Sequence, residues 1–140
     1  MTDRPTARKG RCCPSVLQWN TNSLRQRHVD VTLHLLQSEC DILALQEVYA
    51  VAEALRLPGY TGYSGATTCT TCGCTDAPCL ADAHHTGKPR AAIYVRSNLA
   101  HAVVPVANVV GGPLECCAVT VRLGNQDMTV ASMYIHPGKP

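Results

Sequence analysis

Runs of apolar residues separated by polar, turn-forming residues predict several strands along this chain. The run Asp41–Glu47 holds four consecutive apolar residues without alternation, which is typical of a strand buried on both faces. An earlier run, Val16–Asn22, predicts a second short strand and ends in two carboxamides. Each predicted strand therefore finishes near a side-chain oxygen, that of Asn20 or of Glu47.

The segment between these strands has the spacing of an amphipathic helix. Ser23 and Gln26 predict a capping box at its start, and we expect the helix to end near Ser38. Its apolar face is marked at intervals of three and four residues by Leu24, His28, Val31 and Leu35. The residues expected to widen this stripe toward the sheet are Val29, Leu33 and Leu36. We interpret His28 as a packed or half-buried histidine rather than a ligand.

Strand, helix and strand form one crossover, which predicts an α/β fold. Parallel strands joined in this way bring their carboxyl ends to the same edge of a sheet, where sites on open α/β sheets form. We therefore expect Asn20 and Glu47 to lie close together. A charged carboxylate at the end of a buried strand is costly unless a cation or hydrogen-bond donors offset it, which makes Glu47 a site candidate. The alternative is a glutamate that has already reached solvent.

The rest of the chain predicts further short elements. Tyr49–Leu57 is predicted to form a short helix, and Gly59–Ser64 alternates like a strand. Thr67–Gly87 has no apolar period and is expected to be a loop or insertion. The later strands are predicted at Ala91–Arg96, Ala102–Val106, Cys116–Arg122 and Met128–Tyr134. We expect the last two to form an antiparallel hairpin, and Pro105, which lacks an amide hydrogen, to lie in an edge strand.

Composition narrows the class of protein more than its function. At 140 residues with 46% hydrophobic content, the chain suits one globular domain. A net charge of +2 is too small to argue for nucleic-acid binding. Residues 1–14 are predicted to form a basic flexible tail, and no apolar stretch is typical of a signal peptide or a membrane span. We therefore expect an intracellular protein whose nine cysteines are reduced thiols, some of which could bind metal.

Three segments, taken in order, resemble the first three signature segments of the endonuclease/exonuclease/phosphatase family. They are Trp19–Leu24, Asp41–Glu47 and Met133–Pro137. Their amino-acid sequences are most similar to those of the endonuclease domains of non-LTR retrotransposons, which nick DNA for target-primed reverse transcription. The resemblance implies that residues 15–140 form the amino-terminal half of a two-sheet α/β/β/α sandwich, with a Cys- and His-rich insertion at residues 67–87.

Members of this family hydrolyse phosphodiester or phosphomonoester bonds with a divalent metal, Mg²⁺ or Mn²⁺. The resemblance implies that Glu47 is a metal ligand, that Asn20 orients this carboxylate or binds near the metal, and that Tyr134 hydrogen-bonds the scissile phosphate. It also implies DNA as a partner and, for a retrotransposon endonuclease, a nuclear location. Without the motifs, Asn20 would be interpreted as a turn-forming amide and Tyr134 as a core residue.

The chain departs from the family pattern in two respects. Asn22 stands where many DNA-repair members carry an aspartate. The family's Gly-Asp-x-Asn and Ser-Asp-His segments, which supply water activation and transition-state donors, have no counterpart in the sequence, and nothing around Asp127 or His136 resembles them. We therefore expect a partial domain that is inactive alone and that associates with the missing carboxyl-terminal half or with itself.

A separate group of cysteines and histidines has a spacing that suggests zinc. Cys69 and Cys72 form a Cys-x2-Cys pair, which is the most ligand-like spacing in the chain. The residues that could complete a tetrahedral site are Cys74, Cys79, His84 and His85. The alternative is a cysteine-rich insertion with solvent-exposed thiols.

Two other functions are compatible with the same residues. One is a zinc-stabilised interaction module that keeps half of a nuclease fold without its chemistry. The other is a phosphoesterase of the same family that acts on RNA or small phosphates, because the early motifs are shared across substrates. Zinc content and DNA nicking distinguish the interaction module from the endonuclease.

Overall fold

The computed structural model describes residues 14–68, 89–109 and 114–135. Within these ranges the chain forms one helix, α1 (Leu24–Gln37), and nine strands. The strands are β1 (Val16–Asn20), β2 (Ile42–Gln46), β3 (Tyr60–Ser64), β4 (Ala66–Thr68), β5 (Ala91–Arg96), β6 (His101–Val104), β7 (Ala107–Val109), β8 (Leu114–Leu123) and β9 (Gln126–Ile135). No helix in the described ranges has the length and apolar content needed to cross a membrane.

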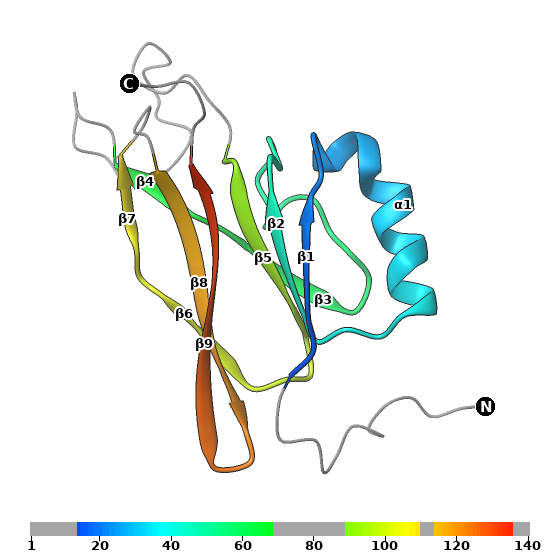
Figure 1. The fold of residues 1–140 in the computed structure, drawn as a ribbon, viewed down its shortest axis with the longest axis vertical. Coiled ribbons are helices and arrows are strands. Elements are labelled where there is room, and N and C mark those ends of the chain that lie inside the picture. Colours follow the sequence, from blue (N-terminus) through cyan, green and yellow to red (C-terminus); the bar gives the residue numbers. More distant parts are fainter. Residues whose placement is uncertain (1–13, 69–88, 110–113, 136–140) are drawn as a thin grey trace.

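The first sheet has the strand order β1-β2-β5-β3, with β1 and β2 parallel and the other neighbours antiparallel. All five residues of β2 are buried, which confirms the prediction of a strand covered on both faces. Because α1 joins β1 to the parallel β2, the predicted crossover is present (Figure 1). The buried Asp41 carboxylate fixes the start of β2 by accepting a hydrogen bond from the Ser15 N–H at 2.9 Å.

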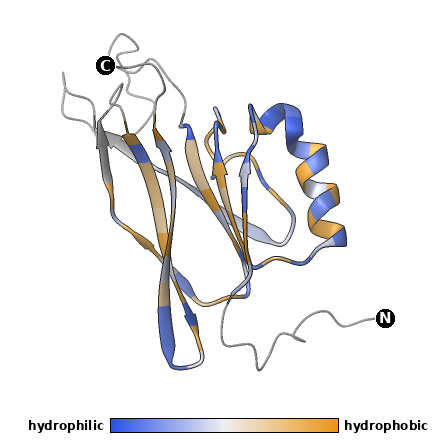
Figure 2. Ribbon diagram, viewed as in Figure 1, coloured by the Kyte–Doolittle hydropathy of each residue, from blue (hydrophilic) through white to orange (hydrophobic). Residues whose placement is uncertain are grey.

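The second sheet has the order β6-β8-β9, and β8 and β9 form the predicted antiparallel hairpin. Its inner face packs on the first sheet in a core cluster of Ile42, Ala91, Ile93, Val95, Cys117, Val119 and Val121. Figure 2 shows apolar stretches along β5 and β8, and hydrophilic residues near the turn that joins β8 to β9. A short parallel pair, β4 and β7, completes the described strands.

The helix α1 covers the other face of the first sheet, so a helix and two sheets lie in successive layers (Figure 1). Leu24 and Val31 are fully buried and belong to a cluster with Leu43, Leu45 and Tyr94. This layering confirms the predicted class of fold, an α/β sandwich with two sheets.

The prediction of a broad apolar stripe on α1 is wrong. The exposed fractions are 66% for Val29, 51% for Leu33 and 76% for Leu36, so these side chains do not widen the buried stripe. At about 100° per residue, they lie roughly 120–180° around the helix from Leu24. The buried stripe is therefore narrow, and these apolar residues face away from the sheet.

The predicted capping box is also absent, although α1 ends at Gln37, next to Ser38, where its end was expected. Ser23 has a φ of 88°, and its side chain makes no capping hydrogen bond. The Ser23 and Leu24 N–H groups instead donate to the carbonyl oxygens of Glu47 and Val48, at 2.8 and 3.1 Å. The loop after β2 therefore replaces the side-chain cap, because it accepts from N–H groups that the start of a helix leaves unpaired.

The short helix predicted between Tyr49 and Leu57 does not form. Val48, Ala50 and Ala52 are buried alternately with more exposed neighbours, and this period of two is not that of a helix. A turn follows, in which the Leu55 N–H donates to the Val51 carbonyl at 3.1 Å. Burial of alternate residues thus overrides the local helical spacing.

Two strand boundaries also differ from the prediction. β6 ends at Val104, ahead of Pro105, and residues 107–109 form the separate strand β7. As expected for the strand that leads into a proline, β6 lies at the edge of its sheet. β4 includes Thr67 and Thr68, which were predicted to lie in a loop, and the rest of the Cys- and His-rich segment is outside the described residues.

Candidate functional site

Asn20 and Glu47 lie at the same edge of the first sheet. Asn20 is opposite Gln46 in the parallel pairing of β1 with β2, and Glu47 follows Gln46 directly. The Thr21 N–H donates to the Gln46 carbonyl at 2.9 Å, and the Ser23 N–H donates to the Glu47 carbonyl at 2.8 Å. The two strand ends are therefore fixed to each other by backbone hydrogen bonds, with the Asn20 side chain exposed and Glu47 half-buried.

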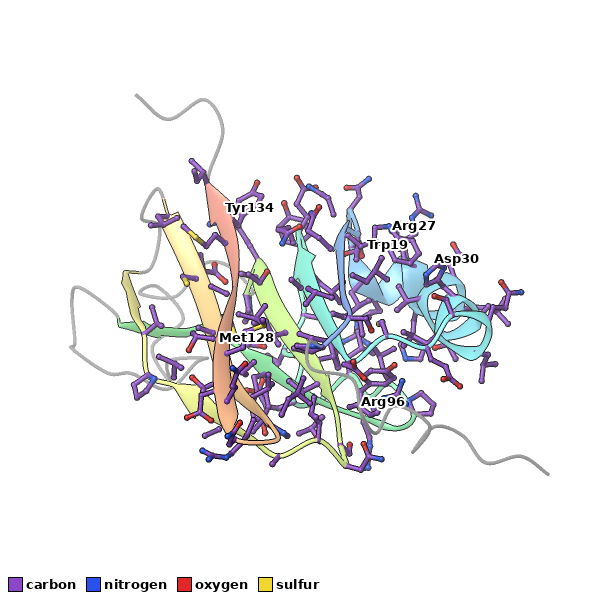
Figure 3. All side chains as sticks on the ribbon, turned by 60° about the horizontal axis from the view of Figure 1, so that its bottom comes forward. Trp19, Arg27, Asp30, Arg96, Met128 and Tyr134 are labelled. Carbon is purple, nitrogen blue, oxygen red and sulfur yellow. The ribbon has the colours of Figure 1, made fainter. Side chains whose placement is uncertain are left out.

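The second sheet brings Tyr134 to this edge. Ser132 of β9 donates to the Leu45 carbonyl at 2.7 Å and accepts a hydrogen bond from Gln46 Nε2 at 3.0 Å. Tyr134 is two residues further along the same face of β9, so it lies beyond the end of β2, near Glu47. Figure 3 shows Tyr134 at the carboxyl end of β9, at the same end of the molecule as the last residues of β1.

Arg90 and Glu115 complete the edge, and neither was a candidate from the sequence. The Arg90 guanidinium carbon lies 5.8 Å from the centroid of the Tyr134 ring. The Glu115 carboxylate accepts hydrogen bonds from the Arg90 N–H at 2.7 Å and the Ala91 N–H at 2.9 Å. Glu115 is 8% exposed, and a lone carboxylate in an apolar strand is the same signal that pointed to Glu47.

Tyr49 is a second phenol at this edge. Partial burial, a hydrogen bond with Tyr134 and the charges of Tyr134 and Glu47 raise the pKa of Tyr49, while Arg90 opposes the shift. At neutral pH the Tyr49 hydroxyl carries its proton and can donate a hydrogen bond. These interactions also show that Tyr49, Tyr134, Glu47 and Arg90 share one electrostatic environment.

The backbone is strained at this edge. Among the residues that the structure describes, the non-glycine residues with positive φ are Asn22 (47°), Ser23 (88°), Glu47 (53°) and Tyr49 (50°). Such conformations are uncommon for residues other than glycine, and they persist where surrounding contacts over-determine them. The backbone hydrogen bonds between the end of β1 and the end of β2 supply those contacts here.

The oxygen donors at this edge of the sheet suit a divalent metal ion, but they do not complete its coordination shell. Glu47 offers a carboxylate, and Asn20 offers a carboxamide oxygen that already accepts a hydrogen bond from the Asn22 N–H at 3.2 Å. Mg²⁺ and Mn²⁺ prefer oxygen ligands of this kind. The described residues contain no group of three or more His, Cys, Asp or Glu side chains that could hold a metal ion. A metal bound here would therefore depend on water and substrate oxygens.

Other residues considered from the sequence lie elsewhere. Asp127 pairs with Arg122 at 3.1 Å near the turn between β8 and β9, and both side chains are exposed. His28 is half-buried, as expected, and its Nε2 contacts the Arg56 carbonyl at 2.7 Å. The proposed zinc ligands Cys69, Cys72, Cys74, Cys79, His84 and His85 are outside the described residues, as is His136.

Comparison with known proteins finds one kind of similarity. No protein-family model matches the chain, and no curated protein sequence does. A solved structure does match, described as the endonuclease domain of TRAS1, a telomere-specific non-LTR retrotransposon. The TM-score is 0.61 at 20% sequence identity, over 91% of this chain and 49% of that one. The chain thus spans about half the length of that domain, and over this span it has the fold of a retrotransposon endonuclease domain.

Proposed function

We propose that this chain carries part of a metal-dependent phosphodiesterase site of the retrotransposon endonuclease type, with DNA as its substrate. The observation that carries the proposal is the meeting of Asn20, Glu47 and Tyr134 at one edge, from three different strand ends. Support also comes from the fold, which is similar to that of a retrotransposon endonuclease domain. A protein that nicks chromosomal DNA would act in the nucleus.

The residues at the edge have distinct roles in this proposal. Glu47 holds a divalent cation, and Asn20 binds beside it or orients the carboxylate. The cation, when bound, polarises a phosphoryl oxygen and stabilises the charge of the leaving group. Tyr134 donates a hydrogen bond to a non-bridging phosphate oxygen and so fixes the scissile bond against Glu47.

We further propose that the chain does not cleave DNA by itself. Glu47 supplies a single negative charge for the metal, and Mg²⁺ held by one carboxylate depends on additional oxygens to stay in place. Hydrolysis also needs a group that activates water and donors aimed at the developing charge, each worth orders of magnitude in rate. The described residues hold no group of three or more His, Cys, Asp or Glu side chains that could strengthen the binding of the metal.

A plasmid assay tests both parts of the proposal. The chain is incubated with supercoiled DNA in Mg²⁺ or Mn²⁺, and binding and nicking are measured beside Glu47→Ala. Asp127→Asn is the matched control, because it removes an exposed carboxylate near the turn between β8 and β9. We expect metal-dependent DNA binding that is lost in Glu47→Ala and kept in Asp127→Asn, without nicking. Nicking that requires Glu47 would refute inactivity, and metal-independent behaviour in all variants would refute the site.

A non-catalytic interaction module is the second candidate, favoured by one observation. Leu114, Met133 and Ile135 are 44%, 50% and 69% exposed, and they share the outer face of β8 and β9. Exposed apolar residues gathered on one face are typical of a surface that another protein element covers. Such a module would associate through this face and would bind DNA equally well with Glu47→Ala, whereas the phosphodiesterase site would not.

A further inference from the structure

We propose that Arg90 is a phosphate-binding residue of this edge, and that Glu115 and Tyr134 position it. The inference deepens the proposed function and rests on it, because the phosphate is that of the DNA substrate. Its starting point is that Arg90 stands just before β5, whose first residue, Ala91, pairs with Gln46 at the end of β2.

The backbone of Arg90 is fixed from both sheets. Its carbonyl accepts a hydrogen bond from the Val48 N–H at 3.1 Å, which belongs to the loop after β2. Its N–H donates to the buried Glu115 carboxylate of β8 at 2.7 Å, and the next N–H, that of Ala91, donates to the same oxygen at 2.9 Å. Hydrogen bonds to a charged acceptor are about twice as strong as neutral ones, so this attachment is firm.

The side chain of Arg90 is directed by Tyr134. Glu115 is opposite Tyr134 in the pairing of β8 with β9, so the carboxylate that holds the backbone and the ring that faces the guanidinium are neighbours. The guanidinium carbon is 5.8 Å from the ring centroid, a cation–π distance. Glu115 thus fixes the main chain of Arg90, and Tyr134 fixes the direction of its charge.

The charge of Arg90 is not used in an ion pair within the described residues. Arg96 contacts Asp41 at 3.5 Å and Arg122 contacts Asp127 at 3.1 Å, whereas no described carboxylate pairs with the Arg90 guanidinium. The one carboxylate that binds Arg90, Glu115, does so through the backbone N–H. A half-buried cation that is held in one direction and has no acidic partner in the described part of the chain is prepared for an anionic ligand.

A phosphodiester fits the donors at this position. The planar guanidinium presents parallel N–H groups that match the oxygens of a phosphate. The hydroxyl groups of Tyr49 and Tyr134 lie in the same environment, and a phenol hydroxyl can donate a hydrogen bond to a phosphate oxygen. Arg90 therefore offers an anionic substrate a positive charge of the protein itself, in addition to the cation that Glu47 is proposed to hold.

The test compares variants of Arg90 for DNA binding in the presence of Mg²⁺, the condition under which the proposed function expects binding. A short fluorescein-labelled DNA duplex is titrated by anisotropy at several salt concentrations with the parent chain, Arg90→Met, Arg90→Lys and Arg122→Met. The last is the matched control, because it removes one positive charge from an exposed arginine near the turn between β8 and β9. Circular dichroism and urea unfolding establish that each variant is folded.

Arg90→Met should weaken binding about tenfold and reduce the slope of log K against log salt by about 1, as loss of one phosphate contact predicts. Arg90→Lys should recover most of the slope but only part of the affinity, and Arg122→Met should resemble the parent chain. Parent-like affinity and slope in Arg90→Met would overturn the inference while leaving the proposed function intact. A parent chain that does not bind the duplex would overturn both.

Discussion

Removal of the Ser132 hydroxyl should destabilise the contact between the two sheets beneath the candidate site. This hydroxyl donates to the Leu45 carbonyl at 2.7 Å and accepts a hydrogen bond from Gln46 Nε2 at 3.0 Å. Ser132 is 1% exposed and Gln46 is 9% exposed, so water cannot replace the lost partner. In Ser132→Ala the Gln46 Nε2 donor keeps only a marginal contact with the Ala44 carbonyl at 3.5 Å, while Gln46 Oε1 still accepts a hydrogen bond from Gln18 Nε2.

The expected magnitude follows from these contacts. A buried amide donor left without an acceptor costs about 1–3 kcal/mol, and loss of the hydrogen bond to the Leu45 carbonyl adds about 1 kcal/mol. We expect Ser132→Ala to lower the free energy of unfolding by roughly 2–4 kcal/mol. In a Gln46→Met background the amide is already gone, so the same change should cost only about 1 kcal/mol.

Urea unfolding of the parent, both single variants and the double variant gives the coupling free energy directly. We expect a coupling of at least about 1 kcal/mol between Ser132 and Gln46, with little change in the dependence on urea concentration. If the free-energy losses of the two single variants add up to that of the double variant within about 0.3 kcal/mol, Ser132 and Gln46 do not depend on each other. The hydrogen bond between them would then not join the two sheets.

The other predictions concern pH, association and zinc. Burial raises the pKa of Cys117 from 9.0 to about 12. The stability contributed by the buried neutral thiol is therefore complete below pH 9 and is lost as the pH rises through about 12. The decline in the urea midpoint over this pH range should be smaller in Cys117→Ala. Met133 and Ile135 should cause the chain to self-associate and bind a hydrophobic dye, and Met133→Lys should reduce both; a sharp, concentration-independent monomer in sedimentation would contradict this. If the chain binds zinc under reducing conditions, the metal should be lost in the Cys69→Ser, Cys72→Ser double variant, and zinc retained by that variant would exclude these ligands.

Much of the fold could be predicted because local pattern and burial agree. The unbroken apolar run of residues 42–45 could only suit a strand covered on both faces, and all of β2 is buried. The crossover through α1 then required Asn20 and Glu47 to meet at one edge. The two adjacent predicted strands, Cys116–Arg122 and Met128–Tyr134, likewise predicted the hairpin of β8 and β9.

The other features of the fold and of the candidate site depend on tertiary contacts, which no local sequence pattern contains. Apolar residues occur on both sides of α1, and only the position of the sheet decides that Val31 is buried while Leu36 is 76% exposed. Arg90 became a candidate only when the pairing of β8 with β9 brought Glu115 and Tyr134 to the start of β5. The start of α1 is capped by the Glu47 and Val48 carbonyls, which are more than twenty residues away in sequence.

The claim that the edge formed by Asn20, Glu47 and Tyr134 binds a divalent metal is tested most directly by paramagnetic NMR. Manganese titrated into the isotope-labelled chain should broaden the signals of Asn20, Glu47 and Val48 first, since paramagnetic relaxation falls steeply with distance from the ion. Glu47→Gln should abolish this localised broadening, and Asp127→Asn should leave it unchanged. Broadening centred on Asp127, or broadening at the edge that persists without the Glu47 carboxylate, would contradict the account.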